Sequence, residues 1–244
     1  MTDTGTVFAR TQDGLGLLAP IDGAGALEEL TATVNAICGR IETGAEKTTL
    51  VLQLSGTPAG GREWPGDVSI QAVNRWERAL RRLERLAVVN IAVARGTCGG
   101  AALDLLLTAD LRIAATDLEI VLPVNDGHFW PGMSVHRLVQ HLGMARARQI
   151  VLWGVTLALP KAIELGLVDQ VGSDLDETVH TAMVLTGQIS DQEMTVRRQL
   201  LLEAASVGHD EALGLHLAAC DRELRRLRQV RSTDAVVPTA AAAP

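Results

Sequence analysis

Aromatic residues are scarce in this chain, whose 244 residues include four tryptophans, two phenylalanines and no tyrosine. Proteins that hold single-stranded nucleic acid stack its bases on aromatic side chains inside a positively charged groove. The formal net charge of this chain is −7, which is the wrong sign for such a groove. We therefore expect no nucleic acid among its ligands.

Cysteine is also rare, and its distribution does not suit a disulfide framework. The three residues Cys38, Cys98 and Cys220 are odd in number and far apart, which favours free thiols in a reducing compartment. We accordingly expect a cytoplasmic protein. Neither a C-x-x-C nor an H-E-x-x-H pattern occurs in the sequence, so we expect no metal site.

Long hydrophobic runs are missing as well. No uncharged apolar stretch approaches the length of about 20 residues that a membrane helix needs. The first residues, MTDTG, lack the basic start and apolar core of a signal peptide. We expect neither a membrane partner nor a signal peptide. The composition, with 47% hydrophobic and 21% charged residues, is that of a globular protein with a full core.

Apolar runs typical of buried strands alternate with amphipathic helical patterns along most of the chain. Strands are predicted at residues 48–54, 87–94, 111–114, 118–122 and 168–171, with two short ones between 6 and 18. Helices are predicted at residues 25–42, 68–86, 134–142, 145–152 and 160–165. Such alternation predicts an α/β core.

The C-terminal part has a different character. Residues 175–230 show a helical and partly amphipathic pattern, and the tail beyond residue 232 is low in complexity. We therefore divide the chain into a core of residues 1–185, a helical region of residues 186–231 and a disordered tail of residues 232–244.

The most informative stretch is RGTCGGAALD at residues 95–104, between a predicted buried strand and a predicted helix. A chain that breaks at glycines and then enters a helix leaves backbone N–H groups free at the helix start. Together with the helix dipole, these groups suit an anion or a developing oxyanion. The stretch therefore predicts a binding turn, although glycine turns are also common simple connections.

Asp104 is the carboxylate beside this turn, and two interpretations of it stay open. An aspartate in a first helical turn stabilises the helix through the dipole. Alternatively, its neighbours Leu103 and Leu105 indicate an apolar environment, which would raise the pKa of Asp104 and suit proton transfer near neutral pH. We interpret the nearby Cys98 as a small packing residue under the turn.

A polar loop, PVNDGHFWPG at residues 123–132, provides the other candidates. Asn125, Asp126 and His128 could all reach a site if this loop bends inward. The simpler interpretations are that Asp126 forms a turn and that His128 faces solvent. Trp130 is expected to be a wall of the core or of a pocket.

Arginines are frequent on one face of the predicted helix at residues 68–86, where they interleave with Glu77 and Glu84. Opposite charges three and four residues apart pair along a helix surface. We interpret this face as exposed to solvent.

Three motifs occur in order at residues 95–114, 130–143 and 162–168. They read RG-x-x-GGA-x-x-D followed by ADLRIA, then WPG with RL and LG, and then AIELGLV. Over residues 7–185 the chain thus resembles the crotonase, or enoyl-CoA hydratase/isomerase, superfamily. The resemblance implies a crotonase-like spiral of ββα units that binds a coenzyme A thioester. It also implies that the C-terminal helical region builds a homotrimer or a dimer of trimers.

In the family, two backbone N–H groups polarise the thioester carbonyl and stabilise the enolate. One comes from the glycine-rich turn, and this donor maps onto Ala101, with Gly99 and Gly100 beside the substrate. The position of a family glutamate in the helix that follows maps onto Asp104. The resemblance thus implies that Asp104 is the acid/base.

The other N–H comes from a loop that family members write as A-G-A-D-[IL]. The matching segment here is WPGDV at residues 64–68. Pro65 has no N–H, so the donor is either Trp64 or Gly66.

The chain departs from the family at the other carboxylate. Family hydratases place it in a Q-P-E segment, which here reads L-P-V and puts Val124 at the position. Addition of water to an unsaturated thioester uses two proton-transferring groups, and valine transfers none. Asn125, Asp126 or His128 could substitute, with Val124 and Trp130 lining the substrate site.

The resemblance implies an enzyme of the lyase or isomerase class that hydrates, dehydrates or isomerises an acyl-CoA thioester. It needs no metal or redox cofactor, because the protein supplies positioning and charge stabilisation. Residues 76–86, 98–104 and 130–133 are similar to the DpgB-type auxiliary crotonases of 3,5-dihydroxyphenylglycine biosynthesis. That similarity implies assistance to a type III polyketide synthase in forming 3,5-dihydroxyphenylacetyl-CoA for antibiotic biosynthesis.

Two alternatives remain at this point. A catalytically degenerate crotonase could serve as a partner or scaffold for such a synthase, which Val124 and Pro65 favour. A thioester hydrolase or decarboxylase could use the same backbone donors with a different proton donor.

Overall fold

A computed structural model describes residues 8–11, 14–44, 48–56, 64–154, 156–204 and 206–234. The chain divides into two units, Met1–Met194 and Thr195–Pro244. The last helix continues to Asp234, so the first three residues of the predicted tail are helical. The rest of that tail, and residues 57–63 of the loop before residue 64, lie outside the described residues.

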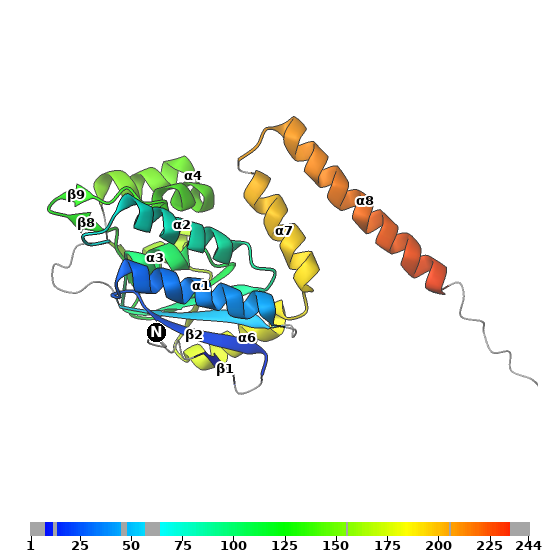
Figure 1. Ribbon diagram of the computed structural model, residues 1–244, viewed down its shortest axis with the longest axis horizontal. Coiled ribbons are helices and arrows are strands. Elements are labelled where there is room, and N and C mark those ends of the chain that lie inside the picture. Colours follow the sequence, from blue (N-terminus) through cyan, green and yellow to red (C-terminus); the bar gives the residue numbers. More distant parts are fainter. Residues whose placement is uncertain are drawn as a thin grey trace, which may run out of the picture. The chain divides into compact units, whose positions relative to one another are not determined.

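The first unit is built on a sheet of six strands, which is parallel except for its first strand (Figure 1). In spatial order the strands are β1 (Ala9–Arg10), β2 (Gly16–Asp22), β3 (Thr49–Ser55), β4 (Asn90–Ala94), β6 (Leu111–Ala115) and β11 (Gln170–Gly172).

Helices cover both faces of this sheet because its central strands are apolar on both sides. In β3, Leu50 and Leu52 belong to one buried cluster, and Val51 belongs to the other. Successive side chains of a strand point to opposite faces, so this single strand supplies two cores. The predicted α/β core is confirmed.

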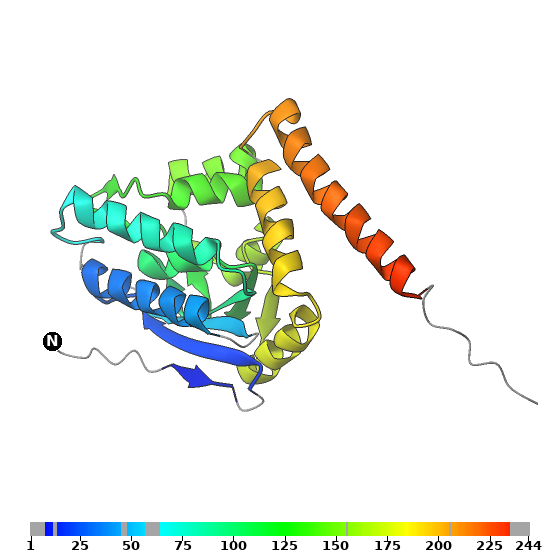
Figure 2. The same ribbon diagram turned by 45° about the vertical axis from the view of Figure 1, so that its right-hand side comes forward.

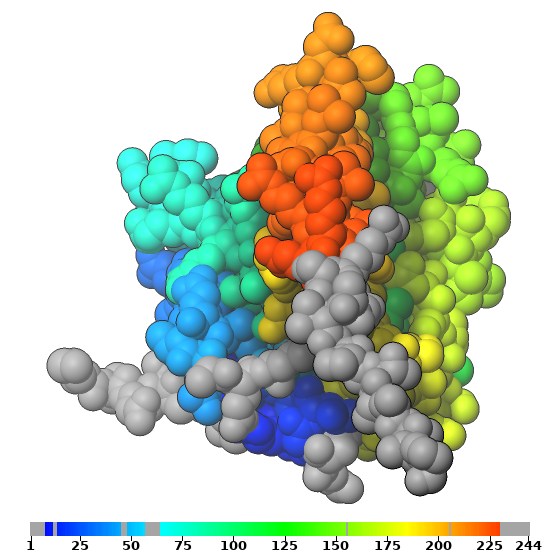
Figure 3. All heavy atoms as spheres, turned by 90° about the vertical axis from the view of Figure 1, so that its right-hand side faces the viewer, coloured from blue at the N-terminus to red at the C-terminus, as the bar shows by residue number. Residues whose placement is uncertain are grey.

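One face is covered by α1 (Leu27–Thr43), α2 (Ile70–Glu84) and α3 (Ala101–Leu106), and the other by α6 (Leu175–Thr186). α1 and α2 lie side by side (Figures 1 and 2), and their residues, blue and cyan, adjoin at the surface (Figure 3). Ion pairs join these two helices, Arg75 with Glu28 and Arg82 with Glu42.

Short elements complete the first unit. A small sheet contains β5 (Thr97–Cys98), β7 (Glu119–Ile120) and β10 (Leu157–Ala158), and two further helices are α4 (Ser134–Trp153) and α5 (Leu159–Leu165). α4 is interrupted at Gly143, which has a φ of 73°. The prediction of separate helices before and after this glycine is therefore confirmed.

The loop predicted at residues 123–132 contains a hairpin of β8 (Val124–Asn125) and β9 (His128–Phe129). Its turn residues, Asp126 and Gly127, have φ angles of 47° and 80°. Positive φ at both positions is what a tight two-residue hairpin turn requires. Asp126 is therefore a turn former, as its sequence context predicted.

α7 (Asp191–Ala204) and α8 (His209–Asp234) continue the helical pattern predicted at the C-terminal part. In the second unit, α8 exposes leucines at positions 213, 217, 224 and 227, with the exposed Cys220 between them. These positions follow a three-and-four spacing, which places them on one side of the helix. None of the described helices is both long and apolar enough to cross a membrane.

Candidate active site

The glycine-rich turn lies between β5 and α3, as the sequence predicted. Gly100 has a φ of 53° and a ψ of −126°, a conformation that suits glycine because it lacks Cβ. A Cβ built on Gly23, just after β2, would lie 3.0 Å from the Cβ of Ala102. The turn thus lies at the carboxyl end of the parallel strands, where ligands of α/β proteins commonly bind.

The amide of Ala101 is a free donor at this turn. The following amides are engaged, since Ala102 donates to the carbonyl of Gly99 at 3.2 Å and Asp104 to that of Gly100 at 3.0 Å. Within the described residues, the N–H of Ala101 has no acceptor. It starts a helix and is therefore oriented as an oxyanion donor would be.

The structure distinguishes the two candidates for the other donor. The N–H of Trp64 donates to Oδ1 of Asn125 at 3.2 Å, and Nδ2 of Asn125 donates to the carbonyl of Trp64 at 2.7 Å. The Trp64 amide is therefore occupied in this conformation. The N–H of Gly66 has no acceptor in the part of the chain that the structure describes, which leaves Gly66 as the available donor.

The indole of Trp64 covers the turn. Its side chain is buried, with 5% of the residue exposed, and a Cβ built on Gly100 would lie 3.1 Å from its Cγ. Its ring meets that of Trp76 edge to face, with centroids 6.3 Å apart and an interplanar angle of 76°. An acyl group that approaches Gly100 from this side must displace the Trp64 ring.

Asp104 is buried in α3, with 5% of the residue exposed. Its Oδ2 accepts a hydrogen bond of 3.1 Å from the indole N–H of Trp76. Burial raises the pKa of Asp104 to about 7. The Trp76 bond and the positive charge of Arg137 oppose this rise, while the negative charge of Glu77 adds to it. The predicted upward shift is thus confirmed.

Cys98 precedes the turn at the end of β5 and is fully buried. Burial, with the negative charge of Asp104 as a smaller cause, raises the pKa of this thiol to about 12. A thiol that stays protonated is a poor nucleophile. The structure therefore confirms the interpretation of Cys98 as a packing residue.

The hairpin does not carry Asp126 or His128 to Asp104. Asp126 and His128 are exposed on it, as is Val124. The charges that act on Asp104 come instead from Glu77 and Arg137. Of the three polar candidates, only Asn125 turns inward, and it binds the Trp64 peptide.

Trp130 closes the base of the hairpin, where its backbone N–H donates to the carbonyl of Pro123 at 3.0 Å. The residue is half-buried and packs against the main core. These contacts fit the predicted role of a wall residue.

An ion cluster joins α2 to α4. Arg137 donates to Glu84 at 2.6 Å and to Glu77 at 3.1 Å, and only 6% of its side chain is exposed. The solvent-exposed interpretation was therefore wrong for Glu77 and Glu84. These glutamates are seven residues apart, two helical turns, and this spacing is the signal that could have indicated a shared partner.

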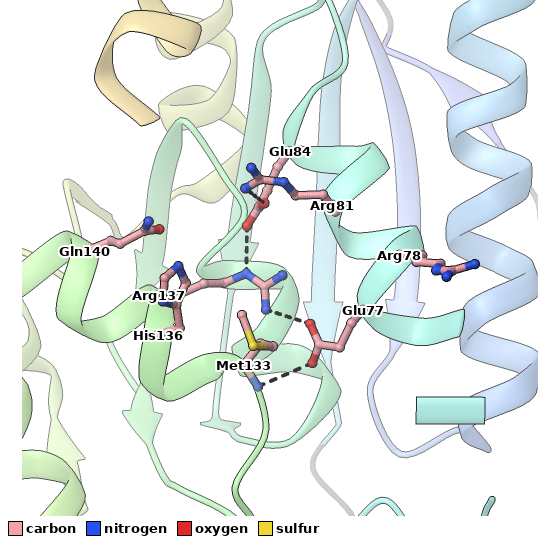
Figure 4. Close-up of a pocket in the computed structure, with 8 residues that line it drawn as sticks. All are labelled: Glu77, Arg78, Arg81, Glu84, Met133, His136, Arg137 and Gln140. Carbon is pink, nitrogen blue, oxygen red and sulfur yellow. Dashed lines mark hydrogen bonds and ion pairs between the residues drawn. The ribbon is translucent and has the colours of Figure 1, made fainter. Parts of the chain in front are cut away.

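The cluster borders a cavity of about 410 Å³ between α2 and α4. Figure 4 shows the guanidinium of Arg137 between the two glutamates, whereas Arg78 points away from it toward another helix. The backbone N–H of Met133 lies 3.4 Å from Glu77 and extends the cluster to the start of α4. Apart from Met133, the residues that line this cavity have polar or charged side chains.

Within the residues that the structure describes, no three histidine, cysteine, aspartate or glutamate side chains come close enough to hold a metal ion. The charged groups around Asp104 pair with one another instead.

Comparison with known proteins connects this geometry to a family. The family model described as enoyl-CoA hydratase/isomerase matches residues 69–219. A protein from Amycolatopsis orientalis named enoyl-CoA-hydratase is 40% identical over 211 residues, which cover 86% of this chain and 96% of that protein.

Solved structures show the same fold at low sequence identity. An enoyl-CoA hydratase/isomerase from Marinobacter aquaeolei is 18% identical, with a TM-score of 0.73 and coverage of 91% of each chain. An enoyl-CoA hydratase from Thermoplasma volcanium is 16% identical, with a TM-score of 0.73 and coverage of 98% of this chain and 100% of that one. The crotonase-like fold expected from the sequence is confirmed.

Proposed function

The chain belongs to the enoyl-CoA hydratase/isomerase family, and on that premise we propose that it converts an acyl-CoA thioester through an enolate held by backbone donors. The observation that carries the proposal is the acceptor-free N–H of Ala101 within the same short helix as the buried Asp104. Ala101 and Gly66 would supply the two N–H groups. Asp104 would transfer the proton.

A single carboxylate limits the reactions that this site supports. In dehydration, Asp104 would take a proton from Cα of a 3-hydroxyacyl thioester and return it to the departing hydroxide, which leaves as water. In isomerisation, it would return the proton to Cγ. Both reactions need only one group that carries a proton. Hydration as the family performs it uses two carboxylates, and Val124 occupies the position of the other one. No metal or redox cofactor enters either route.

The test compares the parent protein with the variant Asp104→Asn. Ala101 is not substituted, because its proposed donor is a backbone N–H that a side-chain change does not remove. Short 3-hydroxyacyl-CoA and 3-enoyl-CoA thioesters are supplied, and the products are identified by mass spectrometry. We expect Asp104→Asn to lower kcat by about 10²–10⁴-fold. An unchanged kcat would refute the assigned role. Free acid would instead identify a hydrolase, and loss of carbon dioxide from malonyl-CoA, supplied in a parallel assay, would identify a decarboxylase.

We further propose 3,5-dihydroxyphenylacetyl-CoA formation, within antibiotic biosynthesis, as the reaction in which this activity acts. Its support is the motif similarity to DpgB-type enzymes, together with the indole ring of Trp76, which lies beside the space that the indole of Trp64 now fills. A flat ring would replace that indole with similar contacts. The test supplies malonyl-CoA and a type III polyketide synthase and follows the aromatic product with and without this protein.

A scaffold role is the second candidate, and the covered turn favours it, because the Trp64 ring lies against Gly100. In that case the protein would bind a polyketide synthase without chemistry of its own. Asp104→Asn separates the two, since a scaffold would keep both synthase binding and the stimulation of product formation. A catalyst would keep binding alone.

We also propose that α8 joins copies of the chain into a homotrimer or a dimer of trimers in the cytoplasm. Its exposed leucines form a stripe of the spacing that pairs helices, and the cysteines described in the structure are free. The test is light scattering of the parent and of a double variant, Leu217→Glu with Leu224→Glu. The proposal predicts a trimer or hexamer for the parent and a monomer for the variant.

A further inference from the structure

Trp76 makes a direct contact with the proposed acid/base. Its indole N–H, on α2, donates to Oδ2 of Asp104, on α3, over 3.1 Å. Both residues are buried, with 2% of Trp76 and 5% of Asp104 exposed. The indole N–H can only donate a hydrogen bond. The bond therefore stabilises the ionised form of Asp104 relative to its protonated form.

The two oxygens of Asp104 are consequently different. Oδ2 is bound to Trp76, and within the described residues no donor binds Oδ1. We propose that Trp76 is a positioning residue, whose N–H fixes Oδ2 and thereby presents Oδ1 as the oxygen that exchanges a proton with the substrate. This inference rests on the proposed function of Asp104.

Other groups also act on Asp104, and they must be separated from Trp76. Glu77 lies on α2, Arg137 on α4 and Cys98 on β5. Glu77 and Arg137 pair with each other at 3.1 Å, so their opposite charges partly cancel at Asp104. Cys98 stays a neutral thiol. Trp76 is thus the one hydrogen-bond donor to this side chain among the described residues, and removing its N–H changes a single interaction.

The decisive variant is Trp76→Phe, which removes the N–H and retains an apolar ring beside Trp64. The matched control is Trp153→Phe, because Trp153 is 77% exposed on α4 and loses the same N–H without touching Asp104. The midpoint of Asp104 is read by carbon-13 NMR of its side-chain carboxyl in the substrate-free protein, with Asp104→Asn to identify the signal.

In the parent protein, we expect the titration midpoint of Asp104 to lie near pH 7, the value to which burial raises its pKa. In Trp76→Phe the ionised form loses its donor, and the midpoint should rise by about one pH unit. The control should match the parent. The pH dependence of kcat/KM on an acyl-CoA thioester should move in the same direction, which a merely structural role of Trp76 would not produce.

An unmoved midpoint in a folded Trp76→Phe protein would overturn this inference alone, even where Asp104→Asn abolishes activity. A moved midpoint together with full activity of Asp104→Asn would overturn the proposed function instead. Where Trp76→Phe does not fold, β-(3-benzothienyl)alanine introduced at position 76 keeps the bicyclic shape and lacks the N–H, and the same outcomes apply.

Discussion

Asn125 binds both polar groups of the Trp64 peptide with one side chain. Its Oδ1 accepts from the Trp64 N–H at 3.2 Å and its Nδ2 donates to the Trp64 carbonyl at 2.7 Å. The two residues are 61 positions apart, so the pair ties the β8–β9 hairpin to the segment that carries Gly66. The orientation of the proposed Gly66 donor therefore depends on Asn125.

Replacing Asn125 by alanine should weaken catalysis through that donor. Loss of the paired hydrogen bonds, together worth about 1–2 kcal/mol, releases the segment, and we expect kcat/KM for an acyl-CoA thioester to fall about tenfold. Asn35→Ala is the control, since Asn35 is an amide on α1 that bonds Arg82. A parental kcat/KM in Asn125→Ala would show that the clamp does not matter for turnover.

The pKa of Asp104 predicts how stability depends on pH. Burial raises this pKa in the folded state to about 7, above its value in the unfolded chain. The folded state then holds the proton more tightly between about pH 4 and pH 7, so the free energy of unfolding falls as pH rises through this window. Urea unfolding of Asp104→Asn and the parent at pH 4.5 and pH 8 measures the effect.

Between pH 4.5 and pH 8, we expect the free energy of unfolding of Asp104→Asn to rise by about 2–4 kcal/mol relative to that of the parent. The comparison is made as a difference, so titration of the other carboxyl groups cancels. A difference that does not change with pH would mean that Asp104 is ionised as easily in the folded protein as in the unfolded chain.

Arg137 should be required for stability, because it neutralises two carboxylates that are largely buried. Arg137→Met removes the cation that pairs with Glu77 and leaves Glu84 with Arg81 alone, at 3.5 Å. We expect a loss of about 3–5 kcal/mol in the free energy of unfolding at pH 7. The triple variant that adds Glu77→Gln and Glu84→Gln should recover most of this lost stability, because it also removes the two negative charges. Denaturant unfolding of the three proteins checks this, and equal losses in the single and triple variants would contradict it.

Gly100 should tolerate no side chain. Its φ of 53° disfavours alanine, and the new Cβ would lie 3.1 Å from the Trp64 ring. We expect Gly100→Ala to lower the free energy of unfolding by about 1–3 kcal/mol. Gly96→Ala, with a φ of 59° and nothing within 4 Å of its Cβ, isolates the backbone contribution. If Gly100→Ala and Gly96→Ala lose the same free energy of unfolding, the Trp64 ring moves away from the new Cβ at no cost and the prediction is wrong.

Local signals in the sequence were sufficient to predict the position of the turn and the apolar environment of Asp104. Both lie within ten consecutive residues, so glycine conformation, helix start and apolar neighbours can be interpreted without knowing the fold. The strand predicted at residues 87–94 was three residues too long, because pairing of β4 with β3 and β6 begins only at Asn90 and Ile91.

The partners of Asp104 could not be predicted in the same way. Trp76 precedes it by 28 positions and looks like any other apolar member of a helical stripe. Arg137 meets Glu77 across 60 positions. Only the packing of α2 against α3 and α4 makes these side chains neighbours. The seven-residue spacing of Glu77 and Glu84 could indicate a shared partner, but it does not identify that partner as Arg137.

The edge-to-face arrangement of Trp64 and Trp76 gives the protein an optical reporter of its own. Two indoles with centroids 6.3 Å apart couple electronically and should produce a near-ultraviolet circular dichroism band. A thioester that moves the Trp64 ring separates the chromophores, so ligand entry becomes visible without a label, a coupled enzyme or a measurable turnover.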